Sequence, residues 1–364
     1  MTNPCLLIDC GKILENAKNL YRLVKLKGVE PVFVMKLLQS DYDFCSWFAK
    51  TVQKTLGLHG LHLAESQPTR LCHLKLPGVF VHQLRLSSKT QIPVTLSHAS
   101  VSIESEMETI KALNVGAQKK QKIHEIMLAC DAGDKREGVN PEDVLEISRQ
   151  IQNLGHIHLR GITTNFGCFS GYIPDCEAMK EHLRWMSNLR ESLKRPDLVY
   201  SLGNTSSLPW LLDYQEKISG PTEIRLGESL FLGLESTTQN QIDGLFTDAF
   251  LLEVEVLESI VKTNMPPDQK LGPNGFKETP TDFVGGSSSR LLLGLGRQDC
   301  DYRGLIPPKG LQILGSSSDY LVVLDQNRQF RVGDTIRLRA DYKSVMGLFR
   351  SPEVEKSFKY PQEN

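Results

Sequence analysis

A lysine directly after a short apolar run is the first residue whose position suggests chemistry. The run is PVFVM, at residues 31–35, and Lys36 closes it. If the run is a buried strand, the ammonium group of Lys36 lies at the rim of a desolvated pocket, which disfavours its charged form. Only a neutral amine attacks a carbonyl. The position therefore suits a carbonyl-binding lysine, although a lysine that extends from a strand end into solvent fits the same pattern and is the commoner case for this spacing alone.

A second candidate site is the segment SLGNTSS (201–207), which precedes the helix-like LPWLLDY. The backbone N–H groups and the side chains of Asn204, Thr205 and Ser206 could hold a phosphate at the start of that helix. An ordinary helix cap gives the same pattern. Together with Lys36, however, the segment indicates pyridoxal 5′-phosphate (PLP), which needs an aldehyde-binding lysine and a phosphate cradle.

The elements that would position these residues alternate along the first two-thirds of the chain. Apolar residues recur at three- and four-residue spacing over 141–154 and 176–194, which predicts helices. Short apolar runs predict strands at 31–36, 61–65, 79–84, 101–105, 126–131, 158–166, 198–204 and 222–227. Such alternation is typical of parallel pairing and, at this number of units, of a closed α/β barrel of the (β/α)₈ (TIM) type. An open doubly wound sheet is the alternative.

The predicted barrel would bring the candidate residues together. In this fold the reactive groups lie at the C-terminal ends of the strands. Lys36, Asn165, Asn204 and Arg225 lie at the ends of four different predicted strands. Gly227 follows Arg225 closely and would let the backbone approach the phosphate oxygens.

The pattern changes near residue 240 to an alternation with a period of two, which predicts antiparallel strands at 250–261, 319–325 and 330–340. We expect a long surface loop at 263–289 and a closing helix at 340–358. The predicted domains are therefore a cofactor-binding barrel, 8–238, and a β-rich C-terminal domain formed by 1–7 and 239–364.

Composition limits the classes of function. The formal net charge of −1 gives no support for binding to nucleic acid or to an anionic membrane. No apolar run is long enough to span a membrane, and the N-terminus lacks a secretory signal. The eight cysteines have no metal-ligand spacing. His62 and His82 share no spacing with carboxylates, so no metal site is predicted. A cytoplasmic protein is expected.

The chain resembles the fold-type III PLP enzymes, the alanine-racemase-like family, and most closely its ornithine racemase branch. The matching segments are PVFVMK, LACDAGDKREGV, GITTNFGCFSGYIPD, SLGNTSSLP, EIRLGESLFLG, LLLGLGRQDCDYRGLIP and LQILGSSSDYLVV. They follow one another in family order over almost the whole chain. The resemblance implies a PLP-dependent amino-acid racemase and a homodimer in which the partner's C-terminal domain completes each active site.

The resemblance also implies roles for individual residues. Lys36 matches the lysine that binds the cofactor aldehyde, and Arg136 matches an arginine near the phenolic oxygen. Asn204 and Thr205 match the phosphate-binding turn, with Gly227 beside it.

Arg225 matches an arginine that donates a hydrogen bond to the pyridine nitrogen. An always-charged donor keeps that nitrogen unprotonated. Electrons left at Cα are then less delocalised into the ring, which favours brief deprotonation and reprotonation. Lys36 would serve one face of Cα.

The proton donor for the second face departs from the family pattern, since Arg297 occupies the position of the family's tyrosine. Cys300 and Asp301 resemble a cysteine–aspartate pair of related decarboxylases. The candidates for the second acid are therefore Cys300 and Asp299, and Tyr302 could also reach the site.

A second departure is Ala129, where many alanine racemases carry a carbamylated lysine that positions the arginine. Arg136 must then be oriented in another way, and Glu137 and Asp134 are candidates.

The branch predicts racemisation of a basic amino acid such as ornithine, or of lysine or arginine. Carboxylates for the substrate side chain are available at Asp299, Asp301, Glu228 and Asp319. Three alternatives stay open: a PLP-dependent basic amino-acid decarboxylase, a non-catalytic PLP-binding protein, and a cofactor-free enzyme that uses Lys36 alone.

Overall fold

The computed structural model describes residues 4–264 and 286–362. The chain divides into two compact units, Ile13–Phe246 and Met1–Lys12 with Thr247–Asn364. The boundaries predicted from sequence lie a few residues earlier. Residues beyond 238 belong with the first unit because Asn16 holds them, accepting from the backbone N–H of Phe246 (2.7 Å) and donating to the Phe246 carbonyl (2.9 Å).

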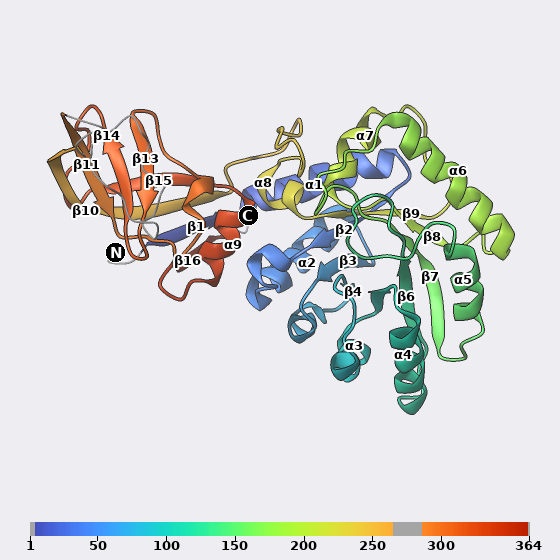
Figure 1. Cartoon of the computed structure of the whole chain (residues 1–364). Helices are drawn as coiled ribbons and strands as arrows, with labels where there is room; N and C mark the ends of the chain where they lie inside the picture. Colours follow the sequence, from blue (N-terminus) through green and yellow to red (C-terminus); the bar gives the residue numbers. More distant parts are fainter. Residues whose placement is uncertain (1–3, 265–285, 363–364) are drawn as a thin grey trace, which may run out of the picture. The chain divides into compact units, whose positions relative to one another are not determined.

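The first unit is a closed barrel of parallel strands in the order of the sequence (Figure 1). Its strands are β2 (Glu30–Val34), β3 (Leu61–Glu65), β4 (Val79–Gln83), β5 (Val101–Glu104), β6 (His124–Ala129), β7 (Ile157–Thr163), β8 (Val199–Ser201) and β9 (Thr222–Leu226). The pairing of β2 with β9 closes the barrel. The predicted α/β barrel with a C-terminal β-rich domain is confirmed, and the open sheet is excluded.

Several strands end earlier than predicted. The chain leaves β2 at Val34, β7 at Thr163 and β8 at Ser201. Residues 164–165 and 203–204 therefore lie in loops, and 205–207 form a 3₁₀ turn. Gly203 has a φ of 88°, which an extended strand does not permit. Polar residues that bond to local backbone groups replace the sheet hydrogen bonds at these ends.

Helices surround the strands of the barrel (Figure 1). They are α1 (Cys10–Leu26), α2 (Tyr42–Leu56), α3 (Ile92–His98), α4 (Met107–Lys119), α5 (Val144–Gln152), α6 (Cys176–Leu193), α7 (Leu208–Asp213) and α8 (Glu228–Leu232), with the 3₁₀ segments η1 (Lys36–Leu38), η2 (Pro68–Leu74), η3 (Lys89–Gln91) and η4 (Thr205–Ser207). Side-chain caps fix where two of them begin. Asp41 accepts from the N–H of Phe44, and Asp175 accepts from that of Ala178.

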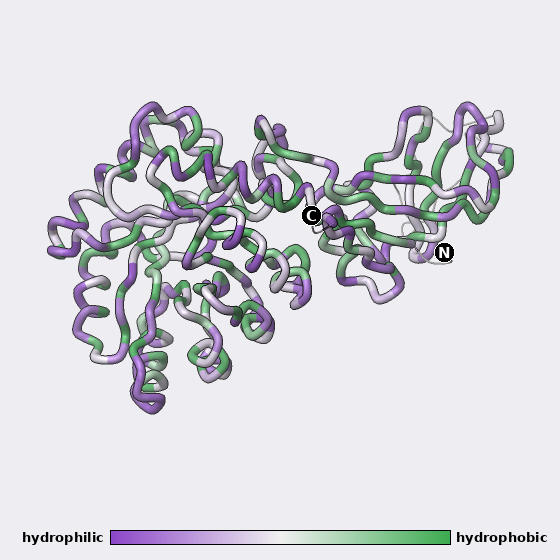
Figure 2. Tube along the Cα trace, turned by 180° about the vertical axis from the view of Figure 1, so that it is seen from behind, coloured by the Kyte–Doolittle hydropathy of each residue, from purple (hydrophilic) through white to green (hydrophobic). Residues whose placement is uncertain are grey.

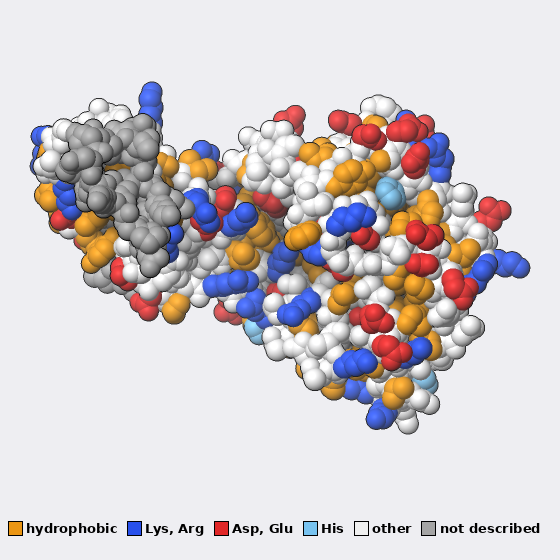
Figure 3. Space-filling view, in the orientation of Figure 1, with side chains coloured by type: hydrophobic (Ala, Val, Ile, Leu, Met, Phe, Trp, Pro, Cys, Tyr) orange, Lys and Arg blue, Asp and Glu red, His pale blue; other side chains and the backbone are white. Residues whose placement is uncertain are grey.

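The barrel interior combines apolar layers with buried charge. Val32, Val34 and Ala64 form one apolar cluster, and Leu84 packs against both this and a second cluster from β5 and β6. Polar side chains of these strands are buried as well, His82, Glu223 and Arg225 among them, and partly buried His62 and Arg160 lie next to them. Over the face of this unit in Figure 3, basic and acidic side chains are interspersed.

The second unit is an antiparallel sheet in the order β12-β15-β10-β11-β14-β13. Its elements are β1 (Cys5–Asp9), β10 (Phe250–Thr263), β11 (Ser287–Leu293), η6 (Tyr302–Gly304), β12 (Leu305–Ile306), β13 (Leu311–Ser316), β14 (Leu321–Asp325), β15 (Thr335–Ala340), α9 (Tyr342–Arg350) and β16 (Glu355–Lys359). β1 pairs antiparallel with β10 and parallel with β16. Hydrophobic and hydrophilic residues alternate along these strands (Figure 2), as the burial pattern of β10 shows.

Three predictions for this unit need correction. The predicted loop 263–289 overlaps the end of β10 and the start of β11, while its residues 265–285 lie outside the described part of the chain. The predicted helix 340–358 is helical only over α9, because Pro352 restricts Ser351 to an extended conformation, and the chain then forms β16. The predicted strand at 330–340 begins only at Thr335, after a turn at Gly333 with a φ of 90°.

Candidate active site

Lys36 is the first residue of η1, directly after β2, and it is half-buried. The backbone on either side is firmly held. Met35 is fully buried and its N–H donates to the Ala64 carbonyl on the next strand (2.8 Å). Gln39 and Ser40 both have positive φ values, 52° and 51°, which are unfavourable for side-chain-bearing residues.

A buried carboxylate stabilises this strained turn. Glu65, at the end of β3, accepts from the Ser40 hydroxyl (2.6 Å) and from the backbone N–H groups of Ser66 (2.7 Å) and Gln67 (2.9 Å). Strain of this kind persists where the surroundings over-determine the backbone. The result is a fixed starting point for the Lys36 side chain at the C-terminal end of the barrel.

Arg136 lies in the loop after β6. Its guanidinium group binds both carboxylate oxygens of Glu137, with Nη2 2.7 Å from Oε1, and Nη1 donates to Sγ of Cys168 (2.9 Å). Nε is 3.8 Å from Oδ2 of Asp134. The Glu137 carboxylate raises the pKa of Arg136 above its ordinary value. Both carboxylates suggested from sequence therefore lie next to Arg136, and Glu137 makes the direct contact.

The turn after β8 is joined to the loop after β7 by side-chain hydrogen bonds. Asn204 Nδ2 donates to Oδ1 of Asn165 (2.8 Å), and Asn204 Oδ1 accepts from the backbone N–H of Ser206 (2.8 Å). The Ser206 hydroxyl donates to the Phe166 carbonyl (2.7 Å), and Thr205 Oγ1 lies 3.2 Å from Oγ of Ser229. Asn204 is thus a helix cap, and the N–H of Ser206 already has a partner.

Arg225 is 8% exposed and points from β9 toward the neighbouring strands. Nη1 donates to the hydroxyls of Thr163 and Ser201 (2.9 Å to Ser201), and Nη2 donates to the Thr164 carbonyl (2.8 Å). Burial lowers the pKa of Arg225 from its ordinary value, and nearby Glu223 opposes that shift. Thr163 and Ser201 were missed from the sequence. Their signal was faint, since each is a small polar residue that closes a strand, Thr163 at the end of β7 and Ser201 at the end of β8.

A phosphate group needs room and unused hydrogen-bond donors, and the turn after β8 provides a glycine and a free hydroxyl. Gly203 is required by its φ of 88°, and a Cβ there would lie 3.1 Å from Cδ2 of Phe166 and 3.3 Å from Oγ of Ser207. Ser207 Oγ is buried and has no hydrogen-bond partner within residues 4–264 and 286–362. A Cβ on Gly227 would lie 3.3 Å from Cβ of Val34. A buried, unused hydroxyl beside a glycine turn fits the phosphate group of PLP.

Cys300 and Asp299 belong to the other unit and lie in the turn between β11 and η6. Asp299 accepts from the N–H of Gly296 (3.0 Å) and from the hydroxyl of Ser351 (2.7 Å). Burial, reinforced by Asp299, raises the pKa of Cys300 to about 12. The thiol is therefore protonated near neutral pH, and the Asp299 carboxylate stabilises the turn. The carboxylate of Asp301 also has a partner, because it forms an ion pair with Arg303 at 2.8 Å.

Two histidines meet inside the barrel. His62 Nδ1 lies 2.8 Å from Nε2 of His82, and Phe80 stacks on the His62 ring. Burial, together with the charge of Arg160, lowers the pKa of His62 to about 4, and burial lowers the pKa of His82 as well. Among the described residues, no group of three or more His, Cys, Asp or Glu side chains is arranged to hold a metal ion.

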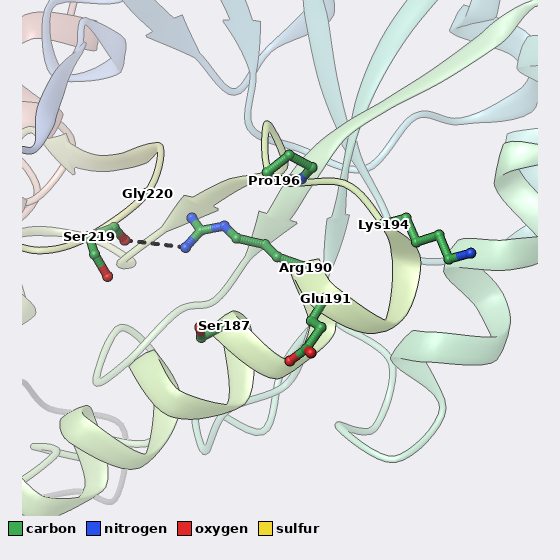
Figure 4. A pocket seen from close by; sticks show the side chains of 7 residues that line it. All are labelled: Ser187, Arg190, Glu191, Lys194, Pro196, Ser219 and Gly220. Carbon is green, nitrogen blue, oxygen red and sulfur yellow. Dashed lines mark hydrogen bonds between the residues drawn. The ribbon is translucent and has the colours of Figure 1, made fainter.

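A surface pocket at the C-terminal end of α6 does not involve these residues (Figure 4). Arg190 extends across it and donates to the carbonyls of Leu198 (2.9 Å), Ser219 (3.3 Å) and Pro221 (2.6 Å). Its guanidinium group thereby fixes the segments that enter β8 and β9. Elsewhere in the described structure, no helix is both long and apolar enough to cross a bilayer.

A closed parallel barrel with a lysine after its first strand, joined to an antiparallel β domain, defines the alanine-racemase class of folds. The protein-family model named alanine racemase, N-terminal domain, matches residues 8–235 of the chain. The alanine racemase of Bartonella henselae, solved with covalently bound pyridoxal phosphate, superposes with a TM-score of 0.70 at 15% identity, over 99% of this chain and 100% of that one. At that identity the superposition establishes the fold alone.

Sequence relatives narrow the class further. An ornithine racemase of Acetoanaerobium sticklandii is 30% identical over 357 residues, which cover 97% of this chain and 99% of the relative. A lysine racemase of Thermotoga maritima is 32% identical over 371 residues, covering 98% and 99%. The chain belongs to the alanine racemase family, and it is an amino-acid racemase, an isomerase.

Proposed function

We propose that the protein is a PLP-dependent racemase that interconverts the L- and D-forms of a basic amino acid, with ornithine the first candidate and lysine or arginine the next. The two sequence relatives, named for ornithine and lysine, support the substrate class. The observation that carries the proposal is the pairing of β2 with β9, since Lys36 follows the first of these strands and Arg225 lies on the second. The turn after β8 adds the unused hydroxyl of Ser207.

Four parts of the chain would hold the cofactor. Lys36 provides the amine for the aldehyde. The turn Asn204–Ser206, with Ser207 behind it, surrounds the phosphate, and Gly227 keeps space beside Val34. Arg136 donates toward the phenolic oxygen. When bound, PLP withdraws the electron pair that deprotonation leaves at Cα.

Arg225 determines how far this withdrawal goes. Its guanidinium group donates to Thr163, Ser201 and the Thr164 carbonyl, so it is held rigidly while remaining a donor. A guanidinium group cannot supply a proton readily, even though burial lowers the pKa of Arg225, because its ordinary value is very high. Toward the ring nitrogen of PLP, Arg225 would therefore donate a hydrogen bond without giving up its proton, which would favour the return of a proton to Cα.

Racemisation requires a proton on each face of Cα. Lys36 serves one face. For the other we propose Cys300, with Asp299 as the second candidate, contributed by a second copy of the chain in a homodimer. The high pKa of Cys300, about 12, keeps its thiol protonated, which is the form that donates. Asp299 ranks second because both its oxygens already accept hydrogen bonds.

The test is incubation of the PLP-loaded protein with L-ornithine, L-lysine, L-arginine and L-alanine, followed by chiral chromatography. We expect D-ornithine or D-lysine to form fastest, with no release of carbon dioxide. Borohydride reduction should leave a pyridoxyl adduct on Lys36. The substitution Lys36→Ala should abolish both this adduct and the formation of D-amino acids. Preferred conversion of alanine would refute the basic-substrate proposal, and absence of the adduct would refute the assignment of Lys36.

A further inference from the structure

One buried carboxylate, Asp134, connects two loops at the C-terminal end of the barrel. The residue is 2% exposed and lies in the loop after β6. Its Oδ1 accepts from the backbone N–H groups of Phe169 (2.7 Å) and Ser170 (3.2 Å), and its Oδ2 accepts from Nδ2 of Asn165 (2.5 Å). These partners lie in the segment that follows β7. The predicted role of Asp134 in orienting Arg136 does not account for these hydrogen bonds, because Nε of Arg136 is 3.8 Å from Oδ2 and Glu137 makes the direct contact.

The hydrogen bonds continue from Asp134 in one direction only. A carboxylate has no proton to donate, so the amide nitrogen of Asn165 must face it. The Asn165 oxygen is then turned toward Asn204, whose Nδ2 donates to it (2.8 Å). The Asn204 oxygen is in turn left for the backbone N–H of Ser206 (2.8 Å). Each amide orientation follows from the one before it.

This directionality matters because the amide oxygen and nitrogen of an isolated asparagine can exchange places by rotation of the side chain. Were Asn204 reversed, its amino group would face the N–H of Ser206, and two donors would oppose each other. The cap of η4 would then be lost, and with it the backbone conformation at 204–206. The Ser206 hydroxyl, which donates to the Phe166 carbonyl (2.7 Å), ties the same turn to the segment that Asp134 holds.

We propose that Asp134 is a positioning residue that, through Asn165 and Asn204, holds the turn 204–207 in the shape that accepts the cofactor phosphate. The inference rests on the proposed function, since it concerns the same turn. It also predicts the direction in which the phosphate affinity changes when the Asp134 carboxylate is removed. A carboxylate near a bound anion would by charge alone weaken phosphate binding, so its removal would tighten binding. A positioning role predicts that its removal weakens binding.

The experiment compares the affinity of the apoprotein for PLP with its affinity for pyridoxal, which lacks the phosphate, by absorbance titration. The dissociation constant for pyridoxal divided by that for PLP measures how much the phosphate group contributes to binding. We expect Asp134→Asn to reduce this ratio about tenfold or more, as expected for the loss of a hydrogen bond to a charged group. Asp131→Asn is the matched control. Asp131 lies in the same loop and accepts only from Gly133 and Lys135 among the described residues, so the ratio should not change.

A reciprocal exchange tests the direction of the relay. Asn165→Asp alone places two carboxylates together and should also lower the ratio. In the double variant Asp134→Asn/Asn165→Asp, the new amide can donate to the new carboxylate, which can still accept from Asn204. We therefore expect the double variant to recover most of the ratio, which simple damage to the fold would not produce. If Asp134→Asn does not fold, Asn165→Asp and the double variant decide alone.

The outcomes separate the two proposals. If the unmodified protein binds no PLP, the proposed function is wrong. If it binds PLP and Asp134→Asn keeps or raises the ratio, or if the double variant recovers nothing beyond Asn165→Asp, the positioning role of Asp134 is wrong while the proposed function stands.

Discussion

At the residue scale, charged groups in this protein are held by partners from neighbouring loops and strands. Arg225 is held by two hydroxyls and one carbonyl, and Arg136 is held by Glu137 and Cys168. In both cases the partners leave the guanidinium group charged and restrict its rotation. The difference is exposure, because Arg225 is buried in the barrel whereas Arg136 lies at the surface.

Glu137 provides a prediction at this scale. Glu137→Gln replaces a bidentate carboxylate with an amide that can accept at one end only, so Arg136 should lose its orientation. We expect kcat/KM for the preferred amino acid to fall about tenfold. The thermal midpoint should change little, because the pair is partly exposed and solvent screens it. Glu142→Gln, an exposed carboxylate a few residues on, serves as the control. Equal losses in both variants would contradict a specific role for Glu137.

At the element scale, the barrel strands carry charge in an interior that such folds usually fill with branched apolar side chains. Arg160 lies 3.3 Å from Glu125 and 3.9 Å from Glu223, and its charge also reaches His62 and His82. Burial raises the pKa of Glu223, while the guanidinium groups of Arg160 and Arg225 oppose that rise. The positive charge of the arginines favours the neutral form of His62 and His82. The stability of the barrel should therefore fall when the pH is low enough to protonate these histidines.

The histidine pair gives a stability prediction. His62 has a pKa of about 4 in the folded protein, below its ordinary 6.5, so the folded state disfavours its protonation. Its contribution to stability is complete above pH 6.5 and is lost as the pH falls toward 4. We expect His62 to lower the unfolding free energy of the barrel by about 2 kcal/mol between pH 7.5 and pH 5, in addition to the losses from His82 and His124, whose pKa values burial also lowers.

Urea unfolding at both pH values tests this prediction. His62→Phe should reduce the pH-dependent loss by about 2 kcal/mol whatever its effect at pH 7.5, because Phe cannot take up a proton, while the losses that arise from His82 and His124 remain. His59→Phe, which replaces a histidine in the loop before β3, should leave the loss in place. An unchanged loss in His62→Phe would assign it to other groups facing the pair, Glu30 and Glu223 among them.

At the scale of the whole molecule, the candidate residues divide between the two units. Lys36, Arg136, Asn204 and Arg225 belong to the barrel, whereas Cys300 belongs to the β-rich unit. A shared active site in a homodimer would bring the two groups together from different chains. This division makes the proposed dimer testable by complementation.

Mixing two inactive variants tests the shared site. Lys36→Ala and Cys300→Ala should each be nearly inactive alone. In a mixed dimer one site would carry both defects and the other neither. With random exchange half of the dimers are mixed, so about one quarter of the sites should recover activity. Substantial activity of Cys300→Ala alone would exclude Cys300 as the second acid, and no recovery on mixing would argue against a shared site.

Much of the fold was predictable because it follows local patterns. The barrel strands were recognised from apolar runs, and α6 was predicted to within one residue because its apolar spacing continues to Leu193. Lys36 stood out because a charged residue after an apolar run is unusual, and Arg225 was found from its place at a predicted strand end and from the family resemblance. The predicted closing helix failed beyond Arg350, since a single proline stopped it.

The amino-acid sequence by itself determined the order of strands and helices, the family, and which residues stand at the strand ends, because these depend on side-chain type and spacing along the chain. Only the tertiary structure decided that Glu137 pairs with Arg136, that Thr163 and Ser201 hold Arg225, and that Asp134 orients Asn204 through Asn165. These contacts join segments far apart in the chain or depend on rotamers, and hydrogen bonds of that kind form only once the barrel has closed.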